Sequence, residues 1–256
     1  LANLWEYRDL IYFLTWRDVK VRYKQTVLGA AWAVIQPFLS MVVFSLFFGV
    51  LAKIPSEGVP YPVFAYCALL PWQFFSQALD LSGNSLIESR RLITRVYFPR
   101  LVVPISAILV GILDFCISFV ILLGLLFYYK ISPTPAVLFL PMFVLMAVLT
   151  ALGAGLWLSA LNVLYRDVRY TITFLIQIWF FLTPIVYPAS LVPEKWRILY
   201  AVNPMVGVVE GFRWSLLGTS KYPGYSFIVS LIIVVLLLIS GVFYFRRMER
   251  IFADVI

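Results

Sequence analysis

Residues 101–129 read LVVPISAILVGILDFCISFVILLGLLFYY, and Asp114 is the one charged side chain in this run. A helix needs about 20 predominantly apolar residues to cross the hydrocarbon core of a bilayer, so the run predicts a membrane-spanning helix. The whole chain has the same character, since 63% of its 256 residues are hydrophobic and 12% are charged. Soluble domains carry about 25% charged residues. The composition therefore predicts a membrane protein.

Five further apolar runs approach or exceed the length of a membrane span, and most charged residues lie between them. With the first, they cover residues 30–52, 62–81, 101–129, 136–164, 170–187 and 226–245. We therefore expect an all-α membrane protein whose six transmembrane helices occupy residues 30–256.

The distribution of positive charge predicts the orientation of these spans. If the N-terminus is cytosolic, 14 of the 20 Lys and Arg residues fall on the cytosolic side. Cytoplasmic loops carry an excess of Lys and Arg, so both termini are expected in the cytosol. The net charge of +8 is then a topology signal, which argues against nucleic-acid binding.

Residues 1–29 precede the first apolar run and predict an amphipathic helix. Trp5, Tyr12, Trp16 and Tyr23 fall within about 40° of one another at 100° per residue. Such a helix suits the cytosolic surface of a membrane. Two interpretations stay open at this point: a simple membrane anchor, and a docking helix for a cytosolic partner.

The first cytosolic loop, residues 86–100, predicts a second short helix. From Leu92 onward its apolar residues recur at i, i+1, i+4 and i+5, and Pro99 ends the stripe. One apolar face on a short basic helix suits a groove in another protein. The alternative is an interfacial helix that rests on lipid.

The outer connection, residues 188–225, holds two apolar runs that are too short to span the membrane. The second begins at Asn203 and Pro204, an N-cap followed by proline at the first helical position. Glu210 and Arg213 within it are spaced for an i, i+3 ion pair. Two re-entrant half-helices could line an exit path, or the pair could form an interfacial hairpin.

Several residues allow more than one role. Asp114 within its span is either a proton-relay group or a structural hydrogen-bonding group. Cys67 and Cys116 are expected to be buried, inert thiols. Aromatic residues within spans either face lipid or line a path that suits a carbohydrate polymer; the candidates are Phe38, Phe44, Phe48, Trp179 and Phe181.

The chain lacks the residues that several chemistries need. It contains no His, which argues against His-based catalysis and His metal sites. It contains no G-x-x-x-x-G-K-[ST] phosphate loop and no Asp-x-Asp pair. We therefore expect no catalytic residue, no metal site and no cofactor in this chain, and an energy source in a partner or an ion gradient.

Motifs along nearly the whole chain resemble those of polysaccharide-exporting ABC transporter permeases, the Wzm-like O-antigen and teichoic-acid exporters. They occur in the family's order, and each motif alone is a weak signal. The matching stretches are WRDVKVRYKQTVLGAAW at 16–32, YFPR at 97–100, LSALNVLYRDVRY at 158–170, and NPM at 203–205.

The resemblance implies a homodimer bound to two copies of a cytosolic, Wzt-like subunit that binds ATP and Mg. It also implies export of a lipid-linked polysaccharide across the bacterial inner membrane, by a multi-pass protein in contact with membrane lipid. An aromatic-lined channel and a periplasmic gate at 188–225 are part of the same expectation.

The resemblance and the charge pattern assign the candidate site residues to three groups. Residues expected to couple the chain to the ATPase are Arg90, Arg91, Arg95, Tyr97, Arg100, Arg17 and Arg22. Residues expected to support the inner mouth are Arg166, Asp167 and Arg169. Residues expected in the periplasmic gate are Trp196, Asn203, Pro204, Glu210 and Arg213.

Three rival functions remain open from the sequence. One is an ABC permease that exports a drug or a small lipid. Another is an ion-coupled carrier that uses Asp114. The third is a membrane-embedded acyl- or glycosyltransferase, against which the missing His and the missing Asp-x-Asp pair argue.

Overall fold

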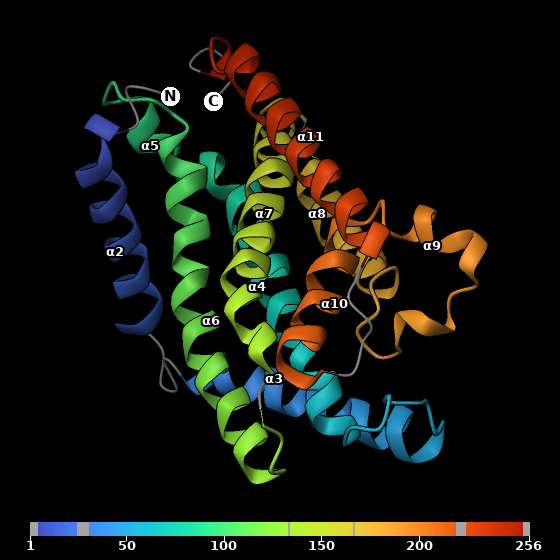
Figure 1. Ribbon diagram of the computed structural model, residues 1–256. Helices are drawn as coiled ribbons and strands as arrows, with labels where there is room; N and C mark the ends of the chain where they lie inside the picture. Colours follow the sequence, from blue (N-terminus) through green and yellow to red (C-terminus); the bar gives the residue numbers. More distant parts are fainter. Residues whose placement is uncertain (1–4, 25–30, 133, 166, 219–223, 253–256) are drawn as a thin grey trace.

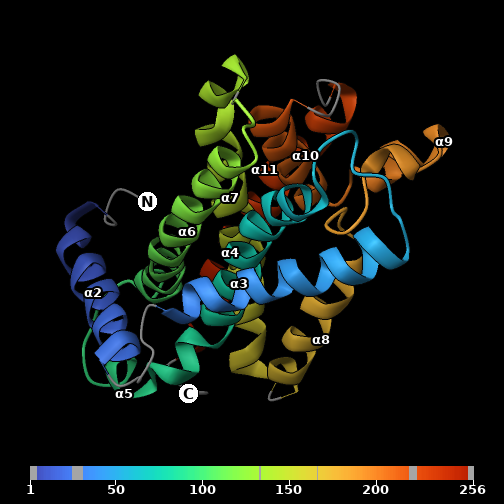
Figure 2. The same cartoon turned by 90° about the horizontal axis from the view of Figure 1, so that it is seen from below.

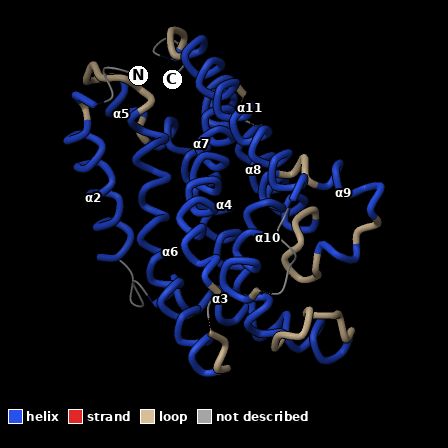
Figure 3. Tube along the Cα trace, in the orientation of Figure 1, coloured by secondary structure: helices blue, strands red, loops and turns tan. Residues whose placement is uncertain are grey.

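The computed structural model describes residues 5–24, 31–132, 134–165, 167–218 and 224–252, and the regular structure in these ranges is entirely helical (Figures 1 and 3). The expected all-α class is confirmed. The elements are α2 (Arg8–Lys24), α3 (Ala31–Phe44), η1 (Ser45–Leu51), α4 (Tyr61–Glu88), α5 (Arg90–Ile93), α6 (Val102–Tyr128), η2 (Pro135–Phe139), α7 (Leu140–Leu164), α8 (Val168–Phe181), η3 (Ala189–Leu191), α9 (Glu194–Tyr200), α10 (Pro204–Leu217) and α11 (Gly224–Met248).

Helix α4 forms the centre of the bundle. It packs chiefly against α6 and α7, and also contacts α3, α8 and α10. From residue 63 to residue 70, no side chain of α4 is more than 2% exposed. This helix therefore connects the elements that flank it on every side.

Among the described residues, four helical stretches are long and apolar enough to cross a membrane, compared with the six runs expected. They are Ala31–Leu51, Val102–Tyr128, Pro135–Leu164 and Gly224–Met248. Helix α8 has 14 residues, which is short for a span. Helix α4 has 28 residues, but polar side chains along it, including Gln73 and Gln77, lower its mean hydropathy.

Helix α2 lies along α6, and the two helices run in the same direction (Figures 1 and 2). Its side chains Leu14 and Val19 are buried. Of the expected aromatic face, Tyr12 and Trp16 are exposed. The helix expected over residues 1–29 is thus present at 8–24, with one side packed on a span.

Helix α3 and its π-helical continuation η1 cross the bundle instead of running along it (Figures 1 and 2). Pro37 lies inside α3 and cannot donate a hydrogen bond to the carbonyl of Ala33. The hydroxyl of Ser118 on α6 donates to that carbonyl at 2.8 Å. The proline is therefore accommodated, and the same bond fastens α3 to α6.

Small residues allow close helix contacts on α7. A Cβ added to Gly155 would lie 2.5 Å from Oγ of Ser82 on α4, and one added to Gly241 on α11 would lie 2.5 Å from the carbonyl oxygen of Gly153. These contacts bring α7 against α4 and α11 within one chain.

The start of α2, helix α5 and the end of α11 lie at the same end of the bundle (Figure 1). A cluster of buried apolar side chains joins them there, including Leu14, Ile93 and Phe245. Of the two cysteines, Cys67 is buried as expected. The expectation for Cys116 was wrong, because its position on α6 leaves it exposed.

Candidate functional site

A stripe of polar side chains runs along α4. Gln73, Gln77, Asp80 and Asn84 are spaced by four, three and four residues, which places them on one face of the helix. The two glutamines are not among the residues predicted from the sequence. Their i, i+4 spacing inside an apolar run was the signal that could have identified them.

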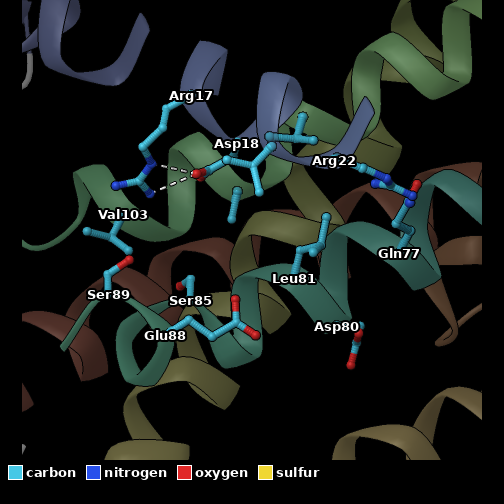
Figure 4. Close-up of a pocket in the computed structure, with 13 residues that line it drawn as sticks. Arg17, Asp18, Arg22, Gln77, Asp80, Leu81, Ser85, Glu88, Ser89 and Val103 are labelled. Carbon is cyan, nitrogen blue, oxygen red and sulfur yellow. Dashed lines mark hydrogen bonds and ion pairs between the residues drawn. The ribbon is translucent and has the colours of Figure 1, made fainter. Parts of the chain in front are cut away.

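Two cavities follow this stripe, and both are lined by Arg22 and Gln77. The cavity between α2, α3, α4 and α6 has a volume of about 330 Å³. The second, of about 490 Å³, lies nearer to the α5 end, between α2, α4 and α6 (Figure 4). Together they place polar side chains of α2 and α4 beside otherwise apolar helices.

An ion pair closes one wall of the first cavity. The Arg22 guanidinium on α2 lies 3.1 Å from the carboxylate of Asp114, which is mostly buried. The hydroxyl of Tyr23 also donates a hydrogen bond to this carboxylate. Because an intramembrane carboxylate is costly unless it is paired, these contacts explain how α6 carries an acidic residue.

The second cavity is richer in carboxylates. Arg17 and Asp18 of α2 form a 2.7 Å ion pair on one side, and Asp80 and Glu88 of α4 lie across from them (Figure 4). Partial burial raises the pKa of Glu88, the Asp80 and Asp18 carboxylates add to the rise, and the Arg169 guanidinium opposes it.

The ATPase-coupling candidates of the first loop occupy α5 and the turn after it. Arg90 and Arg91 lie on α5, and Arg95 and Tyr97 follow it. The helix ends at Ile93, so it is shorter than the predicted apolar stripe. The Tyr97 side chain is 98% exposed, and this part of the loop is therefore accessible to a partner.

Of the remaining coupling candidates, Arg100 and Arg22 contact other elements of the protein, whereas Arg17 pairs with its neighbour on α2. The backbone N–H of Arg100 donates to Glu249 at 2.9 Å, and its guanidinium donates to the Glu249 carbonyl and lies over the Phe252 ring. Arg17 pairs with Asp18, and Arg22 pairs with Asp114. Arg100 therefore connects the first loop to the residues that follow α11.

Two of the inner-mouth candidates flank the start of α8. Asp167 precedes the helix, Arg169 lies on its first turn, and Arg166 falls outside the described residues. Among the described residues, no ion pair joins Asp167 to Arg169. The positive charge of Arg169 instead opposes the rise in the pKa of Glu88 on α4.

The aromatic channel candidates divide into two groups. Phe44 packs against Phe48 and Phe180 with ring centroids 5.8 Å apart in each pair, and Trp179 packs against Phe75 at 4.9 Å. These rings join η1, α3, α4 and α8. Phe38 and Phe181 are instead exposed, at 43% and 71%.

Asn203 of the gate candidates joins the start of α10 to the end of α8. Its side-chain oxygen accepts from the backbone N–H of Met205 at 3.0 Å, as the predicted N-cap requires, and from Nε1 of Trp179 at 2.7 Å. Its amide group donates to the Leu182 carbonyl and the Thr183 hydroxyl, each at 3.0 Å. The expected helix start is confirmed, whereas no local pattern in the sequence indicates the contacts to α8.

Arg213 on α10 is fully buried and holds the segment that follows α8. Its guanidinium donates to the carbonyls of Pro184 and Ile185 at 2.7 and 2.8 Å, and it lies 3.6 Å from the centre of the Phe64 ring. The expected ion pair with Glu210 is present at 3.3 Å. Burial raises the pKa of Glu210, and the Arg213 charge opposes that rise.

The other two gate candidates lie in contrasting surroundings. Pro204 is buried at the start of α10, whereas Trp196 on the seven-residue helix α9 is 56% exposed. Helices α9 and α10 thus form as two separate short elements, of which only α10 enters the core.

Comparison with known proteins identifies the family of this chain. The sequence profile of the family described as ABC-2 type transporter matches residues 9–217. The chain is 32% identical to the O-antigen export system permease protein RfbA of Myxococcus xanthus, over 83% of this chain and 82% of the relative. It is 28% identical to the protein of the same name from Klebsiella pneumoniae, over 99% and 97%. It is 24% identical to the polysialic acid transport protein KpsM of Escherichia coli, over 82% and 80%. This chain therefore belongs to the ABC-2 type transporter membrane family.

Proposed function

We propose that this chain is the channel-forming subunit of an ABC transporter that exports a lipid-linked polysaccharide of the O-antigen type across a bacterial inner membrane. The observation that carries the proposal is the similarity, over 83% and 99% of this chain, to two proteins named as O-antigen export permeases. The energy comes from ATP and Mg bound by a separate subunit, in keeping with the absence of a phosphate loop from this sequence.

The proposal includes six spans. Four are the apolar stretches described above, and the other two are helices α4 and α8. The 28 residues of α4 extend about 42 Å at 1.5 Å per residue, enough to cross a bilayer. Its polar stripe does not need to face lipid, because α2, α3 and α6 surround the cavities along it. The α5 end is cytosolic in this arrangement, and α9 and α10 form a re-entrant periplasmic gate.

A homodimer is supported by the exposure of the first apolar stretch. In Ala31–Leu51, only 11% of the most apolar window is buried within the chain. A second copy would cover part of this surface and enclose a path between the two subunits. Each copy would hold one ATP-binding subunit against α5 and the adjacent turn.

Two contacts support a route from the ATP-binding subunit into the spans. Arg100 ties the first loop to Glu249 beyond α11, and Arg22 ties α2 to Asp114 on α6. A partner that displaces α5 or α2 would therefore act on α11 and α6. Movement of these spans would open the path between the copies.

The experiment that tests the function is deletion of the gene, with assay of polysaccharide at the cell surface. Loss of surface polysaccharide, restored by the wild-type gene, is the expected result. Unchanged surface polysaccharide would refute the proposal. Stimulation of the transporter's ATPase by a drug or small lipid, and not by the lipid-linked glycan, would instead identify a small-molecule exporter.

The coupling residues are tested separately, by replacing Arg90, Arg91, Arg95 and Tyr97 together with alanine. We expect loss of export and of substrate-stimulated ATPase activity, because these side chains provide the exposed surface of the first loop. Arg247→Ala, an exposed charge on α11 at the same end, is the matched control. Normal export by the quadruple variant would show that the coupling assignment is wrong.

A further inference from the structure

The 330 Å³ cavity beside α4 is lined neither by the packed rings of Phe44 and Trp179 nor by the coupling candidates of the first loop. Three amide side chains line it, Gln36, Gln73 and Gln77, together with the rings of Trp32, Phe74 and Phe115. Its volume falls within the range of about 300–1,000 Å³ that is typical of small-molecule sites. The lining is therefore suited to a ligand that has both polar and apolar faces.

The three amide side chains indicate which hydrogen-bonding groups a ligand of this cavity would carry. Each glutamine offers two N–H donors and a carbonyl acceptor, which matches a hydroxyl group that both donates and accepts. A lipid tail or an apolar drug in the cavity would leave these amides unpaired and desolvated, which is costly. A sugar ring would satisfy them, and its C–H-rich face could lie against Trp32 or Phe74.

The charged residues of the two cavities indicate whether such a ligand would be neutral or anionic. Arg22 and Asp114 are the charged residues that line this cavity, and they face each other at 3.1 Å. The adjoining 490 Å³ cavity carries the carboxylates of Asp18, Asp80 and Glu88 alongside Arg17 and Arg22. With Arg169, whose charge acts on Asp80 and Glu88, four carboxyl groups and three guanidinium groups lie along this part of α4, so an anionic sugar that moved along the helix would meet one negative charge in excess.

We propose that this cavity is a binding site for uncharged sugar rings, lined by the amides of Gln36, Gln73 and Gln77. The inference rests on the proposed export of a polysaccharide and goes further, because it assigns a site and selects neutral over acidic glycan units. The Arg22–Asp114 pair closes the site on the α2 side.

The test is saturation-transfer NMR on the full-length chain in lipid nanodiscs. The probes are neutral oligosaccharides of glucose, mannose and galactose, compared with an oligosialic acid of similar length. We expect at least one neutral probe to bind at least tenfold more tightly than oligosialic acid. Absence of neutral binding, or equal binding of oligosialic acid, would overturn the proposal.

Variants of the glutamines that line the cavity test whether the sugar binds there. Loss of one hydrogen bond weakens binding by roughly two- to twelvefold, so Gln73→Leu with Gln77→Leu should weaken the bound neutral probe about fivefold or more. Gln177→Leu, an exposed amide on α8 that does not line the cavity, is the matched control and should bind as wild type. Gln73→Asn with Gln77→Asn keeps the stripe polar if the leucine variant fails to fold, and should weaken binding as well.

The same variants separate this inference from the proposed function. If deletion of the gene leaves the surface polysaccharide intact, the export function itself is wrong. If deletion removes it, but both double variants bind the neutral probe and export like wild type, only the sugar site is wrong.

Discussion

At the scale of single residues, the role assigned to Asp114 depends on the ion-pair partner that the structure reveals. The sequence presented it as an acidic residue without a basic residue in any span. Its partner, Arg22, comes from α2 outside the apolar runs, and Tyr23 binds the same carboxylate. No local pattern predicts a contact across 92 positions (114 − 22), because it depends on α2 lying along α6. The contact supports the structural role over the proton relay.

Asp114→Asn should lower the free energy of unfolding by about 1–3 kcal/mol, since it removes the charge that offsets Arg22 in a partly buried site. Arg22→Gln combined with Asp114→Asn should recover part of that loss. Thermal unfolding in detergent micelles measures both effects. Arg17→Gln, which breaks an exposed pair, is the control and should change stability by less than about 0.5 kcal/mol. If Asp114→Asn abolished transport at unchanged stability, the relay role would return.

At the scale of elements, local signals predicted where helices begin better than how far they continue. The Asn203–Pro204 start of α10 was predictable because an N-cap and a following proline act locally. The early end of α5 was not, because an apolar spacing does not determine where packing stops. The hydrogen bonds from Asn203 to α8 depend on the tertiary fold, and so do the carbonyls that hold Arg213.

Gly241→Ala tests the crossing of α7 and α11. The added methyl group would lie 2.5 Å from the Gly153 carbonyl oxygen, so the two backbones would have to separate. We expect a loss of about 1–3 kcal/mol in unfolding free energy. Gly124→Ala is the matched control, because no atom of the described residues lies within 4 Å of its added Cβ, and it should be neutral or slightly stabilising. Equal effects of the two changes would show that the crossing does not require glycine.

At the scale of the whole molecule, hydropathy predicted a membrane protein and the all-helical class, whereas the number of spans did not follow from it directly. In the part of the chain that the structure describes, four stretches have the length and composition of a span. Helix α4 departs because its polar side chains lower the average over a window, and such an average does not show that these side chains share one face next to two cavities. The crossing of α3 was unpredictable too, since the bond from Ser118 to Ala33 joins distant parts of the chain.

The proposed homodimer predicts cross-linking through α3. In a Cys116→Ser background, Val43→Cys should give a covalent dimer in membranes, because Val43 is exposed on the least buried apolar stretch. Gel electrophoresis without reductant, before and after a thiol cross-linker is added, measures the product. Ile239→Cys, an exposed position on α11, is the control and should remain monomeric. Absence of a dimer at position 43 would mean that α3 is not at the subunit interface.

The polar stripe of α4 has a consequence for biogenesis. A helix whose hydrogen-bonding side chains reach its middle partitions poorly into lipid by itself, whereas the stretches before and after it in the sequence are strongly apolar. We therefore expect α4 to remain at the translocon until α6 has been synthesised. It would then enter the bilayer together with its neighbours. The residues that shape the cavities would in this way also determine the order in which the spans are inserted.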